Sequence, residues 1–518
     1  MTALPAWSIH LPSGTEPDAP LDLVRGRSLV QAWRDHWQHA PDRPVVKLLG
    51  RDDWLTAADL DRGTRDAAAK LAAAGARPGD RVVLSAGTSV DFVVAYVGAL
   101  RLGLVVVPMN TAYKEREVAH VVTDAGATLA IVDDDERAGW IRHAQPRAVI
   151  TTPSLAGLEV GSNHEPLLDR TTSADPALIG YTSGTTGAPK GAVLTHGNLL
   201  ASAEAVAMAW RWTSNDRLLI ALPLFHMHGL GVGVHGTLTT GGQMVLIEKF
   251  ESSTVLDAIE AERATLFFGV PTMYTRLVAD PKATELAKLR LCVSGSAPLP
   301  PDLFGRIEAA ANGRKPLERY GMTETAMLVS NPYEGERRAG SVGFPLPGLE
   351  LKLAPNTQEI WVRGPNVFGG YWNRPEATAD SFTDDGYFRT GDVGEFDPDG
   401  YLKIVGRTKE LIITGGFNVY PREIEDVVRA HPGVGDVAVV GIPNPEWGET
   451  VVACVERADN EAGQALDDEQ LLEFAAAELA PFKKPRAVHF VENLPRNALG
   501  KVVRAELVKA ILTSDSEA

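Results

Sequence analysis

The chain contains very little cysteine. Its 518 residues include two, Cys292 and Cys454, which lie far apart and have no His or Cys at metal-ligand spacing. This pattern implies neither a disulfide framework nor a zinc site. Cys292 falls within the apolar run 289–293, so we expect it to be a small buried core residue.

Long hydrophobic runs are also lacking. The most apolar stretch, residues 90–109, is interrupted by Asp91, Arg101 and two glycines, so it predicts a helix, a turn and a strand over 104–107, not a membrane span. The N-terminal sequence MTALPAWSIHLPSG has neither a basic segment nor a sustained apolar core. We therefore expect no secretory signal and a cytoplasmic protein.

Positive charge is in deficit. The chain has 50 Lys and Arg against 67 Asp and Glu, a formal net charge of -17. This balance argues against non-specific binding to nucleic acid or to an anionic membrane, so an anionic ligand must find a locally basic site. The hydrophobic fraction of 44% is ordinary for a globular protein, and the length suggests several domains. The oligomeric state does not follow from the sequence.

Helical and β-branched segments alternate over residues 21–175. The helical stretch 61–74 is followed by the runs 81–84, 105–107 and 128–132, which predicts a layered α/β fold with largely parallel strands. Further along we expect β-rich segments from residue 358 and then a smaller unit with strands near 411–413, 436–441, 450–456 and 487–491 and helices at 421–431 and 467–480.

The sequence YTSGTTGAPKG, residues 181–191, has the composition of a phosphate-binding loop. Glycine lets backbone N–H groups turn toward an anion, hydroxyls add donors and lysine adds a full charge. The spacing is not that of the Walker A loop. The expected phosphate-binding residues are Thr182, Ser183, Gly184, Thr185, Thr186, Gly187 and Lys190. The alternative is a flexible surface turn.

A second motif is RYGMTET, residues 319–325. Tyr320 offers a ring for stacking, Thr323 offers a hydroxyl for the α-phosphate, and Glu324 offers a hard oxygen ligand suited to Mg²⁺. Taken alone, Thr-Glu-Thr could equally be an ordinary helix start.

The segment 218–230, LLIALPLFHMHGL, has the pattern of a buried strand ending in two histidines, His226 and His228. These could be satisfied strand-end histidines or ligands. Residues 231–236 fit the dinucleotide pattern G-x-G-x-x-G, but a Thr/Gly-rich stretch follows before a long helix could form, so the context argues against a dinucleotide site.

The loop 181–191 closely resembles the phosphate loop of the adenylate-forming superfamily, which comprises acyl-CoA synthetases, luciferases and peptide-synthetase adenylation domains, and the resemblance extends from about residue 29 to 504. It implies an acid–CoA ligase that uses ATP, Mg²⁺ and coenzyme A to form an acyl-adenylate and then a thioester. The implied fold is a large N-terminal domain of layered α/β subdomains plus a β-rich subdomain (1–406), a hinge (407–409, with Lys409 as hinge residue) and a small mobile α+β C-terminal domain (410–518).

The resemblance also implies residue roles. Lys501, in LPRNALGK, would reach between the carboxylate and the α-phosphate, although Asn497 departs from the threonine that is more usual there. His226 would lie near the acyl-adenylate, and with Thr182 and Glu324 it completes the expected catalytic set. Besides the loop residues, the expected nucleotide-binding residues are Gly295, Ser296, Ala297, Arg319, Tyr320, Gly321, Met322, Thr323, Asp392 and Arg407, and those for coenzyme A are Gly415, Gly416, Phe417 and Arg486.

Arg276 bears on the choice of acid. Burying an unpaired arginine beside an alkyl chain costs free energy. A second carboxylate on the substrate would instead form a charge-assisted pair with Arg276, and Ser296 would add a hydrogen bond. The strings GVPTMYTRL, VSGSAPLP, RYGMTET and GSVGFPLPG look similar to malonyl-CoA and methylmalonyl-CoA synthetases, so a short dicarboxylate is expected. An exposed surface arginine is the alternative reading of Arg276.

Two other functions stay open. The string ELIITGGFNVYPREIE looks more like general fatty acyl or aryl ligases, so a medium-chain fatty acid or an aryl acid is an alternative substrate. A non-catalytic nucleotide-binding protein is an alternative of another class, and the presence of Lys501, Glu324 and Asp392 together argues against it.

Overall fold

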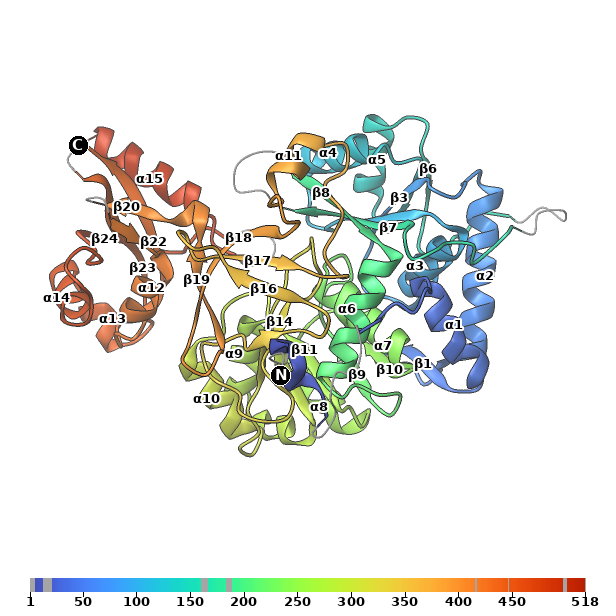
Figure 1. The fold of residues 1–518 in the computed structure, drawn as a ribbon, viewed down its shortest axis with the longest axis horizontal. Coiled ribbons are helices and arrows are strands. Elements are labelled where there is room, and N and C mark those ends of the chain that lie inside the picture. The colour runs from blue at the N-terminus through green and yellow to red at the C-terminus, as the bar shows by residue number, and fades with distance from the viewer. Residues whose placement is uncertain are drawn as a thin grey trace. The chain divides into compact units, whose positions relative to one another are not determined.

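The computed structural model describes residues 5–12, 21–159, 166–182, 189–414, 417–445, 447–496 and 501–517. The chain divides into two compact units, one of residues 1–351 with 362–388 and the other of residues 352–361 with 389–518. The predicted fold class, a large α/β part followed by a smaller α+β part, is confirmed (Figure 1). The hinge at 407–409 stays a prediction.

The first unit is built on two mostly parallel sheets. The nine-stranded sheet has the order β15-β14-β13-β12-β11-β9-β10-β1-β2, and the six-stranded sheet has the order β6-β5-β3-β4-β7-β8. The strands of the nine-stranded sheet are β1 (Pro44–Leu48), β2 (Leu55–Thr56), β9 (Arg217–Ile220), β10 (Gln243–Leu246), β11 (Leu266–Gly269), β12 (Leu291–Ser294), β13 (Leu317–Tyr320), β14 (Val329–Ser330) and β15 (Phe344–Pro345). Those of the six-stranded sheet are β3 (Arg81–Ser85), β4 (Val105–Pro108), β5 (Leu129–Val132), β6 (Val149–Thr151), β7 (Pro176–Thr182) and β8 (Lys190–Thr195).

Helices cover these sheets, as expected for parallel strands joined by crossovers (Figure 1). They are η1 (Ala6–His10), α1 (Leu29–His39), α2 (Ala57–Ala73), α3 (Val90–Leu102), α4 (Glu115–Ala125), α5 (Asp135–Ala144), α6 (His196–Ala209), η2 (His228–Val234), α7 (His235–Thr240), α8 (Ser252–Ala261), α9 (Pro271–Ala279), η3 (Ala283–Lys288), α10 (Pro301–Ala310) and α11 (Pro375–Asp380).

The apolar stretch 90–109 forms a helix, a turn and a strand, as the sequence predicted. Helix α3 starts at the cap Ser89, whose side chain accepts from the Phe92 N–H, and it ends at Gly103 with φ 83°, a backbone conformation that glycine adopts without strain. Strand β4 then runs buried between β3 and β7. Within the described residues, no helix is both long and apolar enough to cross a bilayer.

The prediction of one strand over 218–230 is wrong beyond Ile220, where β9 ends. The chain folds back so closely at Gly229 that an added Cβ would lie 2.4 Å from the Pro223 carbonyl oxygen. It then continues as the π-helix η2 and the short helix α7. The pattern G-x-G-x-x-G at 231–236 thus lies inside helical turns and not in the strand-turn-helix context of a dinucleotide site.

Among the buried histidines of the first unit, His196 and His235 have no exposed surface. His235 stacks on Tyr96 and its Nε2 lies 2.7 Å from the Tyr96 hydroxyl. Neither ring nitrogen of His196 has a hydrogen-bond partner in the described part of the chain. Burial lowers the pKa of His196 to about 4 and the pKa of His235 to about 3, so both rings are neutral in the folded protein at pH 7.

We expect the free energy of unfolding to fall as the pH is lowered from about 6.5 toward 4. In this window the unfolded chain binds protons at His196 and His235 that the folded chain excludes, at about 2 kcal/mol for each histidine between pH 6.5 and pH 5. Urea unfolding across this range measures the slope, and His196→Leu should flatten it. The matched control His143→Leu, at an exposed position of α5, should leave the slope unchanged. A slope equal in wild type and His196→Leu would contradict the prediction.

The second unit contains most of a four-stranded sheet of order β16-β17-β18-β19 and a second sheet of order β21-β20-β23-β22, to which β24 adds beside β23. Their strands are β16 (Glu350–Leu353), β17 (Glu359–Arg363), β18 (Phe388–Phe396), β19 (Leu402–Arg407), β20 (Ile412–Thr414), β21 (Phe417–Val419), β22 (Val434–Asn444), β23 (Gly448–Arg457) and β24 (Ala487–Phe490). The remaining elements are η4 (Thr408–Glu410), α12 (Pro421–Arg429), α13 (Glu461–Ala465), α14 (Asp468–Glu478) and α15 (Arg504–Glu517).

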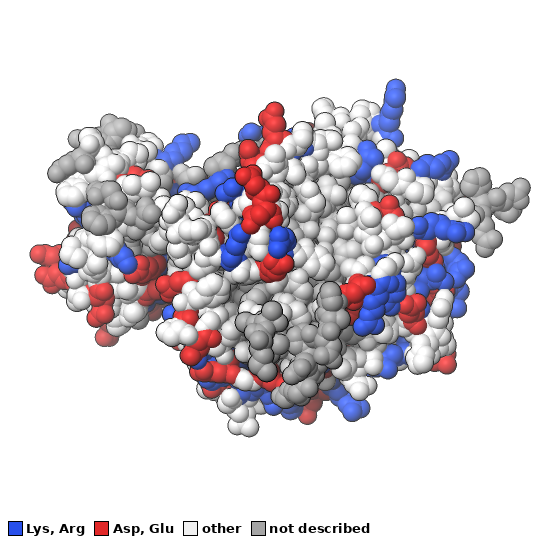
Figure 2. Space-filling model, in the orientation of Figure 1, with Lys and Arg blue, Asp and Glu red and all other residues white. Residues whose placement is uncertain are grey.

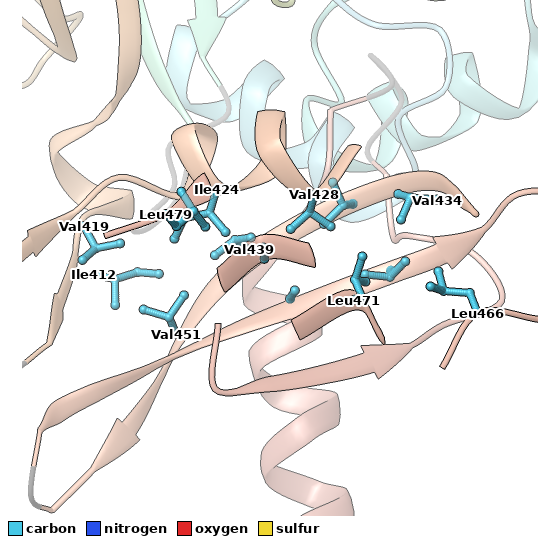
Figure 3. Packing of buried hydrophobic residues seen from close by; sticks show 14 residues of the cluster. Ile412, Val419, Ile424, Val428, Val434, Val439, Val451, Leu466, Leu471 and Leu479 are labelled. Atoms are coloured by element: carbon cyan, nitrogen blue, oxygen red, sulfur yellow. The ribbon is translucent and has the colours of Figure 1, made fainter. Parts of the chain in front are cut away.

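Helices α12 and α14 pack on one face of the second sheet (Figure 3). Ile424 and Val428 of α12 and Leu471 of α14 bury their side chains against Val439 and Val451 of the strands. The apolar residues of β22 alternate between this core and a second core under α15, as the period of a strand requires. The strands and helices predicted for this part of the chain are therefore confirmed to within a few residues.

Candidate active site

The strands β7 and β8 place Thr182 and Lys190 opposite each other. The two strands are antiparallel and Thr182 pairs with Lys190 in their register. The Thr182 hydroxyl donates to the Lys190 carbonyl at 3.4 Å, and the Lys190 side chain is exposed. The residues expected to cradle phosphate between them, Ser183, Gly184, Thr185, Thr186 and Gly187, lie outside the described residues.

The second motif packs directly on β7. A Cβ added at Gly180 would lie 2.4 Å from the Thr323 Cγ2, so only glycine allows this approach. Thr323 is thereby held beside the strand that leads into the predicted phosphate loop. Two motifs that are distant in the sequence thus meet in the first unit, as a shared nucleotide site requires.

Tyr371 joins the two motifs, and no sequence pattern had singled it out. Its hydroxyl donates to the Glu324 Oε1 at 2.9 Å, and the Lys190 Nζ lies 5.3 Å from its ring centroid. A β-bridge to Ala192 fixes its backbone beside β8. Burial, together with the charge of Glu324, raises the pKa of Tyr371, so the phenol remains a proton donor to the carboxylate.

Glu324 fits the expected magnesium ligand. Its residue is 5% exposed and lies next to the two strands that flank the predicted phosphate loop. Among the described residues, no group of three or more His, Cys, Asp or Glu side chains forms a metal site. A single carboxylate suits Mg²⁺, since this ion is usually held by one or two carboxylates together with substrate phosphates and water.

A separate cluster lies at the carboxyl ends of β11, β12 and β13 and consists of Phe268, Gly295, Ser296, His228 and Arg319; we call it the Arg319 cluster. The Ser296 hydroxyl lies 3.2 Å from the His228 Nδ1, and the His228 ring stacks on Phe268 with 6.3 Å between centroids. A Cβ added at Gly295 would lie 2.4 Å from the Arg319 Nε, so the turn after β12 packs directly on the guanidinium.

Arg319 is a buried cation without full compensation. The residue is 5% exposed, and its Nε and Nη2 atoms have no hydrogen-bond partner among the described residues. Burial lowers the pKa of the guanidinium to about 9, which still leaves it charged at pH 7. A buried charge with unused donors is costly and indicates a site for an anion.

The other predicted nucleotide-binding residues of this unit adjoin members of the Arg319 cluster along the chain. The turn 295–297 runs from buried Gly295 to exposed Ala297, with Ser296 at φ 69°. Tyr320, Gly321 and Met322 are partly buried directly after Arg319. These positions leave the expected role in binding adenine a prediction.

His226 and Arg276 differ in their surroundings. The half-buried His226 accepts a hydrogen bond at Nδ1 from the His228 backbone N–H at 3.3 Å. Arg276 lies on the exposed face of α9, the helix that begins directly after β11. Its guanidinium has no ion-pair partner in the described part of the chain, so it is available to an anion, although it is not buried as a pocket floor would be.

In the second unit, Asp392 and Arg407, to which the family resemblance assigns the ribose, form an ion pair, and their role in ribose binding stays a prediction. They face each other in the register of β18 and β19, and the Arg407 Nε donates to the Asp392 Oδ1 at 2.9 Å. Asp392 is 4% exposed, while the side chain of Arg407 is 42% exposed. A carboxylate held in this way can accept the hydroxyl hydrogen bonds of a ribose.

The other predicted residues of this unit lie on different elements. Lys409 is exposed in η4, and Lys501 is exposed just before α15. Arg486 stacks on the Trp447 ring with 4.0 Å to its centroid. Gly415 and Gly416 lie outside the described residues, and for Phe417 the structure describes only the backbone, in β21. The predicted coenzyme A site therefore stays a prediction.

The net charge of -17 does not produce one large acidic field on the face seen in Figure 2. Acidic and basic side chains are interspersed over it. The expectation that an anionic ligand needs a locally basic site therefore stays a prediction, for which the buried Arg319 is a candidate.

The fold is that of an ATP-dependent acyl-CoA ligase of the adenylate-forming type. The family model described as AMP-binding enzyme matches residues 33–372, and that described as AMP-binding enzyme C-terminal domain matches residues 423–501, so the chain belongs to this family.

Particular relatives differ in the acid that their names specify. The solved structure of ATP-bound MatB from Rhodopseudomonas palustris is 39% identical with a TM-score of 0.86, covering 94% of this chain and 99% of that one. A feruloyl-CoA synthase from Amycolatopsis sp is 38% identical over 88% of this chain and 93% of its own length. A malonate–CoA ligase from Arabidopsis thaliana is 37% identical over 84% of this chain and 79% of its own length.

Proposed function

We propose that the protein is an AMP-forming acid–CoA ligase for a short dicarboxylate such as malonate or methylmalonate. The observation that carries the choice of substrate is the buried Arg319, whose unused donors suit the second carboxylate of such an acid. Ser296 and His228 would complete this carboxylate site, and the available Arg276 on α9 would assist from the exposed side.

The neighbours of Arg319 favour the acid over the nucleotide as its anion. Gly295, His228 and Phe268 all follow or lie within strands of the nine-stranded sheet. The proposed phosphate residues Thr182, Lys190 and Glu324 are instead gathered around β7, β8 and Tyr371. Two separate clusters support two separate anion sites, one for phosphate and one for the distal carboxylate.

In the first half-reaction a carboxylate oxygen bonds to the α-phosphorus of ATP while the bond to the pyrophosphate oxygen breaks. Two anions must approach each other, so positive charge and N–H donors have to surround the reacting centre. Lys190 and Lys501 would supply charge, Thr182 and Thr323 would donate hydroxyls, and Glu324 would hold Mg²⁺. The ion, when bound, would neutralise charge on the departing pyrophosphate.

In the second half-reaction the thiol sulfur of coenzyme A bonds to the acyl carbon, AMP leaves and the thiol proton is lost to solvent. Asp392 and Arg407 would hold the ribose of the adenylate through both steps. Rotation of the C-terminal domain about Lys409 would withdraw Lys501 and bring Gly415, Gly416, Phe417 and Arg486 to the thiol.

ATP–pyrophosphate exchange with the full chain and a panel of acids tests this proposal. We expect malonate and methylmalonate to give a kcat/KM at least about tenfold above octanoate and ferulate, because a site built around a buried charge rejects an acid that lacks the second carboxylate. Preference for octanoate or ferulate would overturn the proposed substrate. Absence of exchange with every acid would overturn the proposed enzyme and favour a nucleotide-binding protein.

The similar proteins are the reason for testing both the dicarboxylates and ferulate in this panel. A solved malonyl-CoA ligase complex with methylmalonyl-CoA and AMP is 41% identical to this chain with a TM-score of 0.64, which supports the dicarboxylate. The feruloyl-CoA synthase is of similar identity, and ferulate is therefore the sharpest competitor in the panel.

A further inference from the structure

Lys501 is followed by residues that pair with the backbone of residues 495 and 496; we call residues 495, 496 and 501–504 the Lys501 segment. Val502 forms an antiparallel bridge with Arg496, and the Val503 N–H donates to the Pro495 carbonyl at 2.8 Å. Arg496 also forms an ion pair with Asp436 of β22. One side of the Lys501 segment is therefore held to the second sheet.

The other side is held by Arg504, the first residue of α15. Its Nη2 donates to the Glu425 Oε1 of α12 at 2.7 Å, and its Nη1 lies 3.1 Å from the Glu410 Oε2. Its Nε donates to the Val439 carbonyl at 3.3 Å. The Arg504 guanidinium thus binds η4, α12 and β22, and Arg504 lies three positions after Lys501.

Glu410 directly follows Lys409, the predicted hinge residue, so its ion pair with Arg504 connects the hinge to the residues that follow Lys501. Both side chains of the Arg504–Glu410 pair are about a quarter exposed, at 26% and 24%, so the pair is partly shielded from solvent. Glu425 is more deeply buried, with its side chain 8% exposed, and its Oε1 also accepts from the Val439 N–H at 2.8 Å. Such charge-assisted bonds are stronger and more directional than exposed ion pairs.

We propose that Arg504 and Glu410 are positioning residues for adenylate formation: their ion pair fixes the Lys501 segment to the residue that follows Lys409, so that the two move together. This inference rests on the proposed function, in which Lys501 serves the first half-reaction and Lys409 is the hinge. Without the pair, the Lys501 ammonium would sample more orientations, and the fraction of time that it spends in the productive one would fall.

Glu410→Gln is the main test, because Arg504 variants would leave the buried Glu425 without its partner and could destabilise the unit. We expect Glu410→Gln to lower the kcat of ATP–pyrophosphate exchange about tenfold with little change in the KM for ATP, and Glu410→Asp to recover part of this loss. The rate of thioester formation from chemically prepared acyl-adenylate should change less than twofold. The control Glu423→Gln removes the ion pair between Glu423 of α12 and Lys483, and it should leave the exchange rate unchanged.

A double-mutant cycle with Lys501→Ala separates positioning from a general structural effect. If Glu410 acts through Lys501, Glu410→Gln should cause no further loss of exchange in the Lys501→Ala background. Equal losses in both backgrounds, or a wild-type rate in Glu410→Gln, would overturn the inference while wild-type activity still supports the proposed function. If Lys501→Ala exchanges at the wild-type rate, both the inference and the proposed role of Lys501 fail. If the wild-type protein exchanges with no acid, the proposed function itself fails.

Discussion

Arg319→Met should lower kcat/KM for malonate by about two to four orders of magnitude, because the distal carboxylate would then be buried without a charged partner at a cost of about 3–5 kcal/mol. The effect on octanoate should be small or in the opposite direction, since methionine fills a similar volume without charge. Steady-state kinetics of thioester formation with both acids would measure the change in preference.

The stability of the free enzyme should not fall in Arg319→Met, although its activity on malonate does. Replacing a buried charge that lacks partners by an apolar side chain is often neutral or stabilising, so the midpoint of urea unfolding should stay or rise in Arg319→Met. Arg337→Met is the matched control: Arg337 is also buried, at 8% exposed, but it donates to the carbonyls of Pro332, Tyr333 and Lys315. That variant should lose stability and keep the preference for malonate.

Two outcomes would contradict the assignment of Arg319. A rise in the KM for ATP with unchanged malonate kinetics would place its guanidinium in the nucleotide site, which is the role that the family resemblance implies. Unchanged kinetics with both substrates would remove it from the reaction. Arg276→Ala, on the exposed face of α9, should raise the KM for malonate by about tenfold, a smaller effect, because solvent still screens the charge there.

Lys501→Ala should lower the rate of ATP–pyrophosphate exchange by about two to three orders of magnitude, the range found when one preorganised group is removed from a charge-developing transition state. Thioester formation from chemically prepared acyl-adenylate should be retained, because the acyl–phosphate bond is already formed in that substrate. The comparison of the two half-reactions therefore isolates the step that Lys501 serves.

Lys509→Ala provides the control for this prediction. Lys509 is also exposed and lies on α15, the helix that follows Lys501, but the motif gives it no role. It should exchange at the wild-type rate. A Lys501→Ala enzyme with full exchange activity, or one that loses both half-reactions equally, would contradict a role confined to adenylate formation.

Much of the fold, and the family, could be predicted from short stretches of sequence. Alternating helical and β-branched segments predicted the layered α/β unit, and the motifs at 181–191 and 319–325 pointed to the family that the family models then confirmed. The prediction of a strand over 218–230 was wrong beyond Ile220 because apolar residues alone do not distinguish a buried strand from a buried turn and π-helix.

Local sequence preferences set most of the helices and strands, because hydrophobic periodicity and the conformational preferences of glycine and proline act over a few residues. The packing of distant segments set which groups meet. It set the hydroxyl of Tyr371 on Glu324, left Arg319 buried with unused donors, and paired Arg504 with Glu410. These contacts join residues far apart in the chain, and their energy depends on desolvation by the surrounding packing, which no short stretch of sequence specifies.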